Sequence, residues 1–484
     1  MLKSRKYLWL LIVIFLFCFC KKSSPTSDVN SEAARQIVIL YTNDEHGWME
    51  PCESSAGAAG MMGLWREKEG YTENGPFLIL SGGDMWTGPA ISTWFNGQSM
   101  AEVMNAMDYT AAAIGNHEFD FKVEGLKERL EQSNFPFLAA NIQEKATGNI
   151  AEFAVPYIVK EVNNVKVGII GLASVKTPTT AFPDFVQDYD FTAYDEALVE
   201  YLPKVRQDGA ELIIVVGHIC EREMRDIAST AAQFDIPVIF GGHCHEIVND
   251  TIAGVTIVEA NCNMINYARV EILFDNTADK VMSIKKNVYP NIGGTPDIEV
   301  ESIVSYWQGL RDEALSEVIG YVTQTIAQHS DAMYNMISDS WLFSYPTADI
   351  SITNTGGIRQ SIPAGDIQLA TIVGVLPFEN NIVQLELNGT ELEDCLSSGG
   401  LVVGGMTTIG GYSLSDGTPI YSDTVYSVLT TDYLYSSREE FKLYDTEPYS
   451  TSIHWRQPVI DWIKSLNTSA SNPLDQYLDN TPRQ

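Results

Sequence analysis

Short hydrophobic runs that end abruptly in small or polar residues recur along the first half of the chain. Each run is rich in Val, Ile, Leu or Ala, and each stops at Gly, Asp, Asn or His. The runs lie at 37–46, 77–84, 111–118, 165–174, 211–218, 237–245 and 254–261. Near-continuous apolar runs of this length are typical of strands that are buried on both faces of a sheet.

Amphipathic stretches separate these runs, as expected for helices that cover a sheet. Examples are FKVEGLKERLEQS at 121–133 and YDEALVEYLPKVRQDG at 194–209. Alternating strands and helices predict an α/β domain with helices on both sides. Ligands of such domains bind at the carboxyl ends of the strands, where the polar residues of this chain stand.

The pattern changes near residue 298, and 484 residues are too many for one hydrophobic core. Short strands, Gly turns and more Thr, Ser and Tyr then predict a smaller α+β domain. The predicted organisation is a signal peptide at 1–20, a polar linker at 21–34, an α/β domain at 35–297, a connecting helix at 298–320 and a second domain at 321–484.

The N-terminus has the layout of an export signal. Basic residues within 3–6 precede an uncharged run at 7–19, which is shorter than the roughly 20 residues that span a bilayer. Cys18 and Cys20 end this run, as at a bacterial lipoprotein cleavage site. We expect lipidation at Cys20, with lipidation at Cys18 or an uncleaved anchor as alternatives. The protein is therefore expected to be exported, and lipid-anchored to the cell envelope or periplasmic.

Charge and cysteine content limit the classes of function. The chain carries 63 acidic residues against 30 Lys plus Arg, a formal net charge of -33. Such a surface repels nucleic-acid phosphates, which argues against broad DNA or RNA binding, although solubility alone is a simpler reason for the acidity. Five cysteines follow the N-terminal segment without CxxC or zinc-finger spacing. An exported protein can oxidise a pair, but the sequence does not identify one.

Five of the seven histidines stand at the ends of the hydrophobic runs. A single histidine in such a place is more often structural, but the joint placement indicates a functional site. Imidazole, carboxylate and amide ligands without thiolate suit divalent ions such as Zn, Mn or Co. The candidate ligands are Asp44, His46, Asp84, Asn116, His218, His243 and His245.

These candidates exceed the needs of one ion, so we predict two divalent ions with Asp84 as a bridge. Asp44 and His46 are two residues apart, so on an extended segment both side chains point the same way. The same reasoning applies to His243 and His245, with Cys244 turned away between them. Two ions so held clamp a phosphoryl group and generate hydroxide.

His117 and Asp120 are predicted to form a catalytic pair. His117 is adjacent to Asn116, so its ring points elsewhere, toward the substrate. Asp120 is placed to hydrogen-bond that imidazole and fix its tautomer, while its alternative role is a helix N-cap. His117 would then stabilise the transition state or protonate the leaving alkoxide. Glu118 is interpreted as structural.

The motifs TNDEHG, LSGGDMWTG, GNHEFD, VVGH and GGHCH resemble, in order and spacing, the calcineurin-like metallophosphoesterases. AAAIGNHEFD, the exported N-terminus and the large C-terminal part make the chain similar to the bacterial 5′-nucleotidase family, which includes UDP-sugar hydrolases and 2′,3′-cyclic phosphodiesterases. The resemblance implies an α/β sandwich of two sheets flanked by helices, joined by a helix to an α+β substrate domain.

The resemblance also implies how the side chains divide. Asp44, His46, Asp84 and His245 would hold one ion, and Asp84, Asn116, His218 and His243 the other. In the second domain, 349–367 and 373–392 resemble the family's substrate domain. There Arg359 would contact phosphate, as guanidinium groups do, and a surface salt bridge is its alternative. Asn380 and Asn381 are candidates for base or ribose contacts.

The resemblance weakens at the aromatic residues that hold the base. Leu401 stands where the first aromatic is expected, and 430–445 lacks the Gly-Gly-Asp of the second loop. Phe441 remains the candidate aromatic, with Tyr444 or Asp445 as its neighbour.

The leading hypothesis is an exported two-metal phosphoesterase that hydrolyses nucleotides by metal-activated hydroxide attack on phosphorus. Its partner would be a small phosphoester, with membrane contact only through the N-terminal lipid or anchor. One alternative keeps the metal centre and changes the substrate to cyclic nucleotides, UDP-sugars, sugar phosphates or thiosulfohydrolase substrates. The other alternative is a non-catalytic nucleotide-binding or metal-binding lipoprotein, against which the complete set of candidate ligands argues.

Overall fold

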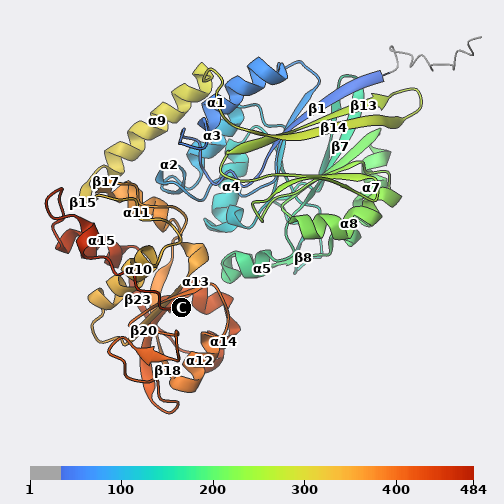
Figure 1. Ribbon diagram of the computed structural model, residues 1–484. Helices are drawn as coiled ribbons and strands as arrows, with labels where there is room; N and C mark the ends of the chain where they lie inside the picture. Colours follow the sequence, from blue (N-terminus) through green and yellow to red (C-terminus); the bar gives the residue numbers. More distant parts are fainter. Residues whose placement is uncertain (1–33) are drawn as a thin grey trace, which may run out of the picture.

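The computed structural model describes residues 34–484. The predicted signal peptide, its lipidation sites and residues 21–33 of the predicted linker lie outside the described residues. The described chain forms two domains connected by a long helix (Figure 1). Within this part of the chain, no helix is long and apolar enough to cross a membrane.

Two six-stranded sheets face each other in the first domain. One has the order β14 (Lys280–Pro290), β13 (Asn266–Asp275), β1 (Ala34–Thr42), β2 (Phe77–Ser81), β3 (Ala111–Ala113) and β4 (Phe137–Leu138). The other has the order β11 (Ile247–Ile252), β12 (Val255–Ala260), β10 (Val238–Phe240), β9 (Leu212–Gly217), β7 (Val165–Leu172) and β6 (Tyr157–Val162). A small pair, β5 (Ile142–Glu144) and β8 (Tyr189–Phe191), lies beside them.

Helices cover the outer faces of both sheets, so the domain has an α/β/β/α order of layers (Figure 1). Apolar side chains of the two sheets, such as Ile39 and Ile214, meet between them. The covering helices are α1 (Gly57–Leu64), α3 (Gln98–Ala106) and α4 (Lys122–Gln132) on one side, and α7 (Tyr194–Gln207) and α8 (Glu221–Gln233) on the other. The seven predicted strands and both predicted helices are present, which confirms the predicted α/β class.

The strands that precede the polar clusters are parallel. β1, β2, β3 and β4 run in one direction, and so do β7, β9, β10 and β12. Their carboxyl ends therefore open on one edge of the sandwich, where the loops after them can bring side chains together.

Helix α9 (Ile298–Leu315) connects the domains and packs along the first (Figure 1). Its N-cap Asp297 accepts hydrogen bonds from two backbone N–H groups of the first turn, and Val300 and Trp307 are buried against α1 and α3. The prediction extended this helix to residue 320. It ends at Leu315 because β15 (Val318–Val322) pairs with β17 (Gly365–Gln368).

The second domain contains a five-stranded sheet with helices on both faces. Its order is β19 (Leu401–Gly404), β16 (Ile350–Asn354), β22 (Val425–Thr431), β18 (Asn381–Asn388) and β23 (Tyr449–His454). One face packs on α10 (Asp331–Ser344) and α15 (Gln457–Ser465). The other packs on α12 (Gly389–Cys395), α13 (Asp432–Ser437) and α14 (Glu439–Tyr444). A short pair, β20 (Met406–Thr407) and β21 (Ser413–Leu414), lies outside this sheet.

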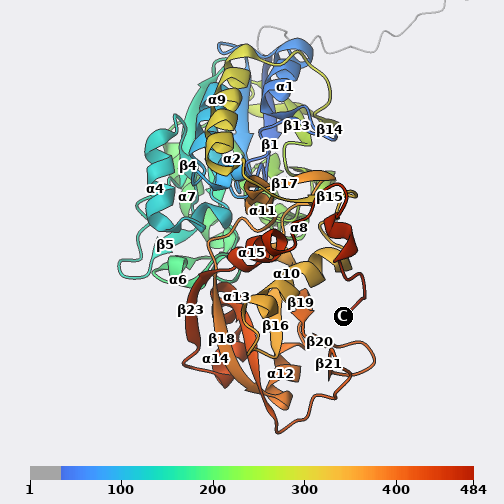
Figure 2. The ribbon, with the colours of Figure 1, turned by 90° about the vertical axis from the view of Figure 1, so that its left-hand side faces the viewer.

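The two domains also touch away from the connecting helix. Helix α11 (Leu369–Val375) of the second domain contacts α2 (Ala90–Thr93) of the first (Figure 2). Val373, Ala90 and Leu315 form a small buried cluster there. This contact lies next to the edge on which the parallel strands open, so the second domain covers that edge.

Candidate metal centre and active site

The seven predicted metal ligands follow the carboxyl ends of five parallel strands. Five of them have a left-handed backbone, which is uncommon for residues other than glycine and costs about 1–3 kcal/mol each. Their φ angles are 50° for Asp44, 47° for His46, 58° for Asp84, 77° for His243 and 58° for His245. The assumption that these pairs lie on extended segments is therefore wrong. Sharp turns, rather than strand alternation, direct the side chains.

One set of donors comprises Asp44, His46 and His245. The Nδ1–H of His46 donates to the Thr87 carbonyl at 3.0 Å, so Nε2 carries the lone pair with which this ring could bind a metal ion. That Nε2 lies 3.2 Å from Nε2 of His245, which is 3.4 Å from Oδ1 of Asp44. Electron pairs of two imidazoles and a carboxylate thus converge on one point.

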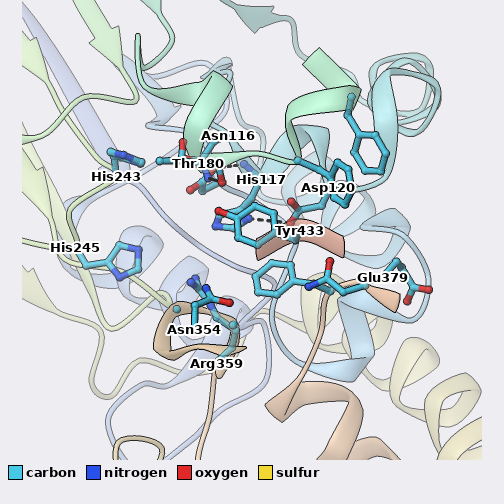
Figure 3. A pocket seen from close by; sticks show the side chains of 17 residues that line it. Asn116, His117, Asp120, Thr180, His243, His245, Asn354, Arg359, Glu379 and Tyr433 are labelled. Atoms are coloured by element: carbon cyan, nitrogen blue, oxygen red, sulfur yellow. Dashed lines mark hydrogen bonds and ion pairs between the residues drawn. The ribbon is translucent and has the colours of Figure 1, made fainter. Parts of the chain in front are cut away.

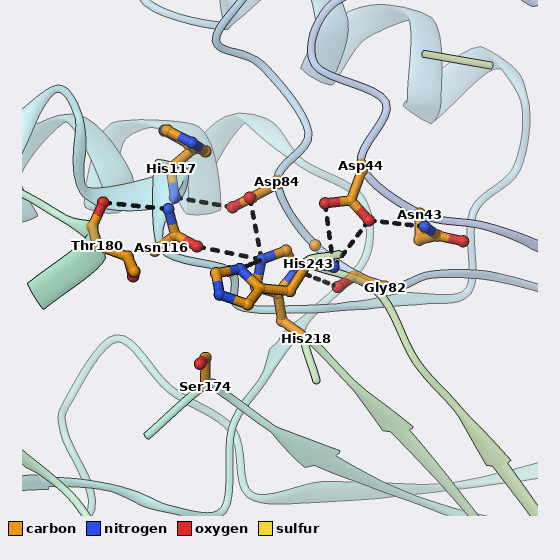
Figure 4. A network of polar contacts seen from close by, with 12 residues as sticks. Asn43, Asp44, Gly82, Asp84, Asn116, His117, Ser174, Thr180, His218 and His243 are labelled. Carbon is orange, nitrogen blue, oxygen red and sulfur yellow. Dashed lines mark hydrogen bonds and ion pairs between the residues drawn. The ribbon is translucent and has the colours of Figure 1, made fainter. Parts of the chain in front are cut away.

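A second set comprises Asp84, His218 and His243, with Asn116 beside it (Figure 4). The Nδ1–H of His218 donates to the Gly82 carbonyl at 2.8 Å. Its Nε2 lies 3.0 Å from Oδ2 of Asp84, 3.2 Å from Oδ1 of Asn116 and 3.1 Å from Nδ1 of His243. The sequence pair His243 and His245 is therefore divided between the two sets.

Most of these separations fit ions held at ordinary ligand distances, whereas Nε2 of His46 and Oδ1 of Asp44 lie farther apart, at 4.0 Å. Two ligands about 2.1 Å from one ion lie roughly 3.0–3.4 Å apart at octahedral or tetrahedral angles. The nitrogen and oxygen donors suit Zn, Mn or Co, and a cation removes the repulsion between facing electron pairs. Asp84 belongs to the second set in this structure, and its bridging role stays a prediction.

Electrostatics at the second set also favour positive charge. Burial disfavours a charged His218, but the Asp84 carboxylate outweighs it and raises the pKa of His218 to about 10. Burial and the neighbouring His218 lower the pKa of His243 to about 4. The Asp84 carboxylate thus favours a positive charge at the point where the two imidazoles meet. A divalent cation bound there would supply that charge.

His117 and Asp120 form the hydrogen-bonded pair that was expected. Nδ1 of His117 donates to Oδ2 of Asp120 at 2.8 Å, and the backbone N–H of His117 donates to Asp84 at 2.8 Å. Burial lowers the pKa of His117, but Asp120 and Asp84 outweigh it and leave that pKa above its ordinary value. Helix α4 has Phe121 at its N-cap, so Asp120 orients the imidazole and does not cap the helix.

Glu118 is a buried carboxylate that holds two loops of the centre together. It accepts hydrogen bonds from the backbone N–H groups of Asp84 at 2.8 Å, Met85 at 2.8 Å and Gly115 at 2.6 Å. This agrees with its interpretation as a structural residue. The left-handed turn at Asp84 is thereby tied to the turn that carries Asn116.

Arg359 reaches the metal centre from the second domain. Its Nη2 donates to Nε2 of His46 at 3.1 Å, and its guanidinium lies 5.9 Å from the centre of the Phe378 ring. It follows the short 3-10 turn Thr355–Gly357 after β16. The alternative role of Arg359, a surface salt bridge, does not describe this contact. The partner of Arg359 is His46, a buried candidate metal ligand of the first domain.

A cavity of about 290 Å³ lies between the domains and contains these groups (Figure 3). His243, His245, Asn116 and His117 line it together with Arg359 and Asn380. Four aromatic side chains complete the lining. Phe185 lies on α6 (Pro183–Val186) and Phe182 immediately precedes that helix, while Phe378 lies on a loop of the second domain and Tyr433 on α13.

The aromatic rings have defined partners in this cavity. Phe378 stacks on His117 at 5.5 Å between centres and 20° between planes. Phe182 stacks on Phe185 at 4.7 Å and lies 6.3 Å from Tyr433 across the domain boundary. The aromatic part of the cavity is thus made by both domains.

Phe441 is not part of this cavity, so the prediction that it contacts the substrate is wrong. Its side chain is fully buried on α14, in the core that also contains Leu392, Cys395 and Leu434. The stretch 430–445 folds as two short helices packed on the sheet. Burying a phenylalanine there stabilises the fold by about 1.5–3 kcal/mol.

Several residues of the cavity were not predicted from the sequence. Phe378 lies within the stretch 373–392 and Asn354 within 349–367, so both stood inside segments that resembled the family. Tyr433 lies in the stretch where the expected motif is absent. Phe182 and Phe185 lie beyond β7 and the short helix α5 (Thr177–Thr180), in a segment without a recognisable motif. Only the tertiary structure shows that they line the cavity.

A disulfide joins Cys220 and Cys244, which are 24 residues apart, with 5.2 Å between their Cα atoms. The sequence did not identify this pair. The sequence feature that could have indicated the pair is the position of both cysteines next to candidate metal ligands. Cys220 follows His218 by two residues, and Cys244 lies between His243 and His245.

Two donor sets for divalent ions, a His–Asp pair and an arginine at the open edge of a two-sheet sandwich define a metallophosphoesterase. Comparison with known families agrees. The family described as calcineurin-like phosphoesterase matches residues 37–246, and the 5′-nucleotidase C-terminal domain matches residues 316–412.

Individual proteins are similar to this chain over most of its length. A cell wall protein of Listeria monocytogenes is 22% identical over 89% of this chain and 67% of its own length. A 5′-nucleotidase of Vibrio cholerae is 26% identical over 78% of this chain and 77% of its own. The crystal structure of a 5′-nucleotidase precursor from Thermus thermophilus has the same fold, with a TM-score of 0.80, 20% identity, and coverage of 93% of this chain and 99% of that one. The chain belongs to the 5′-nucleotidase family.

Proposed function

We propose that the protein is an exported phosphoesterase that removes phosphate from nucleotides. The observation that carries the proposal is the cavity between the domains. Metal donors, His117 and Arg359 line it together with four aromatic rings, and one of these rings, Phe378, stacks on His117. Such a lining suits a ligand in which a sugar joins a phosphate to an aromatic base.

The chain supplies an ordered set of groups for phosphoryl transfer. Asp44, His46 and His245 would hold one divalent ion, and Asp84, Asn116, His218 and His243 would hold the other. When bound, such ions supply polarisation of the phosphoryl oxygens and activation of water. The chain's own part is to fix these donors rigidly and to exclude bulk water by covering the site with the second domain.

His117 and Arg359 would act on the phosphoryl group itself. His117 carries a proton on Nδ1 that Asp120 holds, so its other ring nitrogen faces the substrate as a donor when the ring is protonated. It would stabilise charge on the phosphoryl oxygens or protonate the leaving alkoxide. Arg359 supplies a planar guanidinium that matches two phosphate oxygens, which a surface of net charge -33 needs for an anionic substrate.

Phe378, Phe182 and Tyr433 would contact the base. Aromatic side chains bind nucleobases by stacking, at about 1–3 kcal/mol for each base. Asn380 and Asn354 line the same cavity and are the candidates for polar contacts to ribose or base. Asn381 donates to the Asp432 carboxylate at 3.3 Å, which favours a structural role for it.

The test is hydrolysis of a substrate panel by the purified protein supplied with Mn²⁺ or Co²⁺. AMP and ribose 5-phosphate are the central pair, because they share sugar and phosphate and differ in the base. We expect kcat/KM for AMP to exceed that for ribose 5-phosphate by about tenfold or more. His117→Ala should lower kcat for AMP by about 10²–10⁴, whereas substitution of the exposed His329 by alanine should leave it unchanged.

A second candidate keeps the chemistry and changes the leaving group. It is favoured by the burial of Phe441 and by the absence of a Gly-Gly-Asp loop, since the base is then held differently from the family pattern. Cyclic nucleotides, UDP-sugars and sugar phosphates belong in the panel for this reason. Equal kcat/KM for AMP and ribose 5-phosphate would reject nucleotide recognition. Metal uptake without turnover of any ester would support the non-catalytic alternative.

Export is supported by three observations. The N-terminal sequence resembles a lipoprotein signal, a disulfide is present, and the Listeria relative is named a cell wall protein. Disulfides persist mainly in oxidising compartments. Labelling with a fatty acid tests the anchor, because Cys20→Ser should abolish the label if Cys20 is the lipidated residue.

A further inference from the structure

One metal donor stands on an exposed loop, unlike most of the others. The side chain of His245 is 36% exposed, whereas those of Asp44, His46, Asp84 and His218 are between 0% and 3% exposed. Packing against the sheets fixes the buried donors. The loop that follows β10 needs a different restraint to keep His245 in position.

The backbone of this loop is also in an unfavourable conformation. His243 and His245 have φ angles of 77° and 58°, and such conformations persist only where the surroundings impose them. The N–H of His243 donates to the Asp44 carboxylate at 3.0 Å, and the N–H of Glu246 donates to Glu259 at 2.8 Å. These two hydrogen bonds flank the tip of the loop, and Cys244 is at the tip.

The disulfide ties that tip to a rigid point of the fold. Cys220 is 5% exposed and immediately precedes α8. Its N–H donates to Glu223 at 2.9 Å, and its carbonyl accepts from the N–H of Met224 at 3.0 Å. His218, a donor of the second set, lies two residues earlier. The disulfide therefore joins the loop that carries His218 to the loop that carries His243 and His245.

We infer that the Cys220–Cys244 disulfide positions His243 and His245 before metal binds, and so sets the metal affinity of both donor sets. The inference rests on the metal-dependent function proposed above. Donors that are already ordered lose less conformational freedom on binding. Because His243 and His245 belong to different sets, loss of the disulfide should weaken both sites and not only one.

The test compares the wild-type protein with Cys220→Ser/Cys244→Ser after metal removal by a chelator. Both are titrated with Mn²⁺ in a calorimeter, well below their melting temperatures. We expect the Mn²⁺ dissociation constants of both sites to rise about tenfold or more in the variant. Its kcat should return close to the wild-type value at saturating Mn²⁺, because the ligands themselves are intact.

Ile227→Ala is the matched control. Ile227 is a buried residue of α8, so its truncation lowers stability on the same helix and leaves the disulfide in place. Its melting temperature should fall while its Mn²⁺ dissociation constants stay at wild-type values. This separates positioning of the donors from general stabilisation by a crosslink.

Unchanged Mn²⁺ dissociation constants in the serine variant would overturn the inference, whatever its melting temperature. If the variant does not fold, the wild-type protein is reduced after folding, freed of reductant, checked by thiol counting and titrated in the same way. A wild-type protein that binds no Mn²⁺ would instead reject the proposed function. The two failures are therefore distinct.

Discussion

Glu118 illustrates how one buried side chain supports an unfavourable turn. Asp84 has a φ of 58°, and Glu118 accepts the N–H groups of Asp84 and of the residues Met85 and Gly115. Three backbone donors therefore depend on one carboxylate. The same carboxylate sets the distance between the turn of Asp84 and that of Asn116, which supply donors to one set.

We predict that Glu118→Gln destabilises the protein and weakens its metal centre. An amide accepts hydrogen bonds through one oxygen only, so at least one buried N–H loses its partner, at about 1–3 kcal/mol. Urea unfolding of the metal-free protein measures this loss. Metal affinity at the site of Asp84 should fall about tenfold or more, which a Mn²⁺ titration measures.

Glu131→Gln is the control for that substitution. Glu131 lies on α4 and is exposed, so the same chemical change occurs in water. Its free energy of unfolding should stay within about 0.5 kcal/mol of the wild-type value. Equal stability of the Glu118 and Glu131 variants would contradict the role given to Glu118.

Sequence predicted the chemical identity of this site better than its shape. Asp44, His46 and the other donors were identifiable because residues with metal-binding side chains stood where apolar runs end. Their left-handed backbone was not identifiable, since aspartate and histidine adopt that conformation only where tertiary contacts impose it. Phe441 was misjudged because an aromatic side chain at a core position and one in a binding site look alike in sequence.

At the level of elements, two short helices complete the cavity from opposite domains. Helix α6 and its loop supply Phe182 and Phe185, and α13 supplies Tyr433. Phe182 and Tyr433 lie 6.3 Å apart. A base bound there, as proposed, would touch both domains at once.

We predict that Phe182→Ala raises KM for AMP by about tenfold, because one stacking surface is lost. Kinetics on ribose 5-phosphate should change little, since that ester has no base. Phe343→Ala is the matched control, because Phe343 is 55% exposed on α10. An equal change in KM for AMP and ribose 5-phosphate would show that Phe182 does not contact the base.

The regular elements were predictable where the hydrophobic period was strong. The strands 37–46 and 211–218 and the helix 194–209 are observed as β1, β9 and α7. The end of α9 was overestimated, because the residues after Leu315 carry a helical pattern but pair with β17 instead. Pairing between segments so far apart in the chain is not visible in a local pattern.

For the whole molecule, metal binding and stability are linked. Both donor sets lie in the first domain, and ions that bind only the folded state stabilise it by about 2.7 kcal/mol for each site at a hundredfold excess over the dissociation constant. We predict that a chelator lowers the melting temperature of the first domain and that Mn²⁺ restores it, which scanning calorimetry measures. Asp84→Asn should lose at least the part of this response that comes from the second set, to which Asp84 belongs. Identical melting with and without chelator would contradict the prediction.

The connection between the domains constrains how the cavity can open. The first domain is contiguous up to α9 and the second follows it, so the described chain crosses between them once, just after Leu315. Leu315 itself packs with Ala90 and Val373, and the rest of α9 is fixed along the first domain. The second domain is therefore attached at a single pivot. Any swing about it withdraws Arg359, Phe378 and Tyr433 together from the metal donors and from Phe182, so entry of the proposed nucleotide and departure of its products would share one gate.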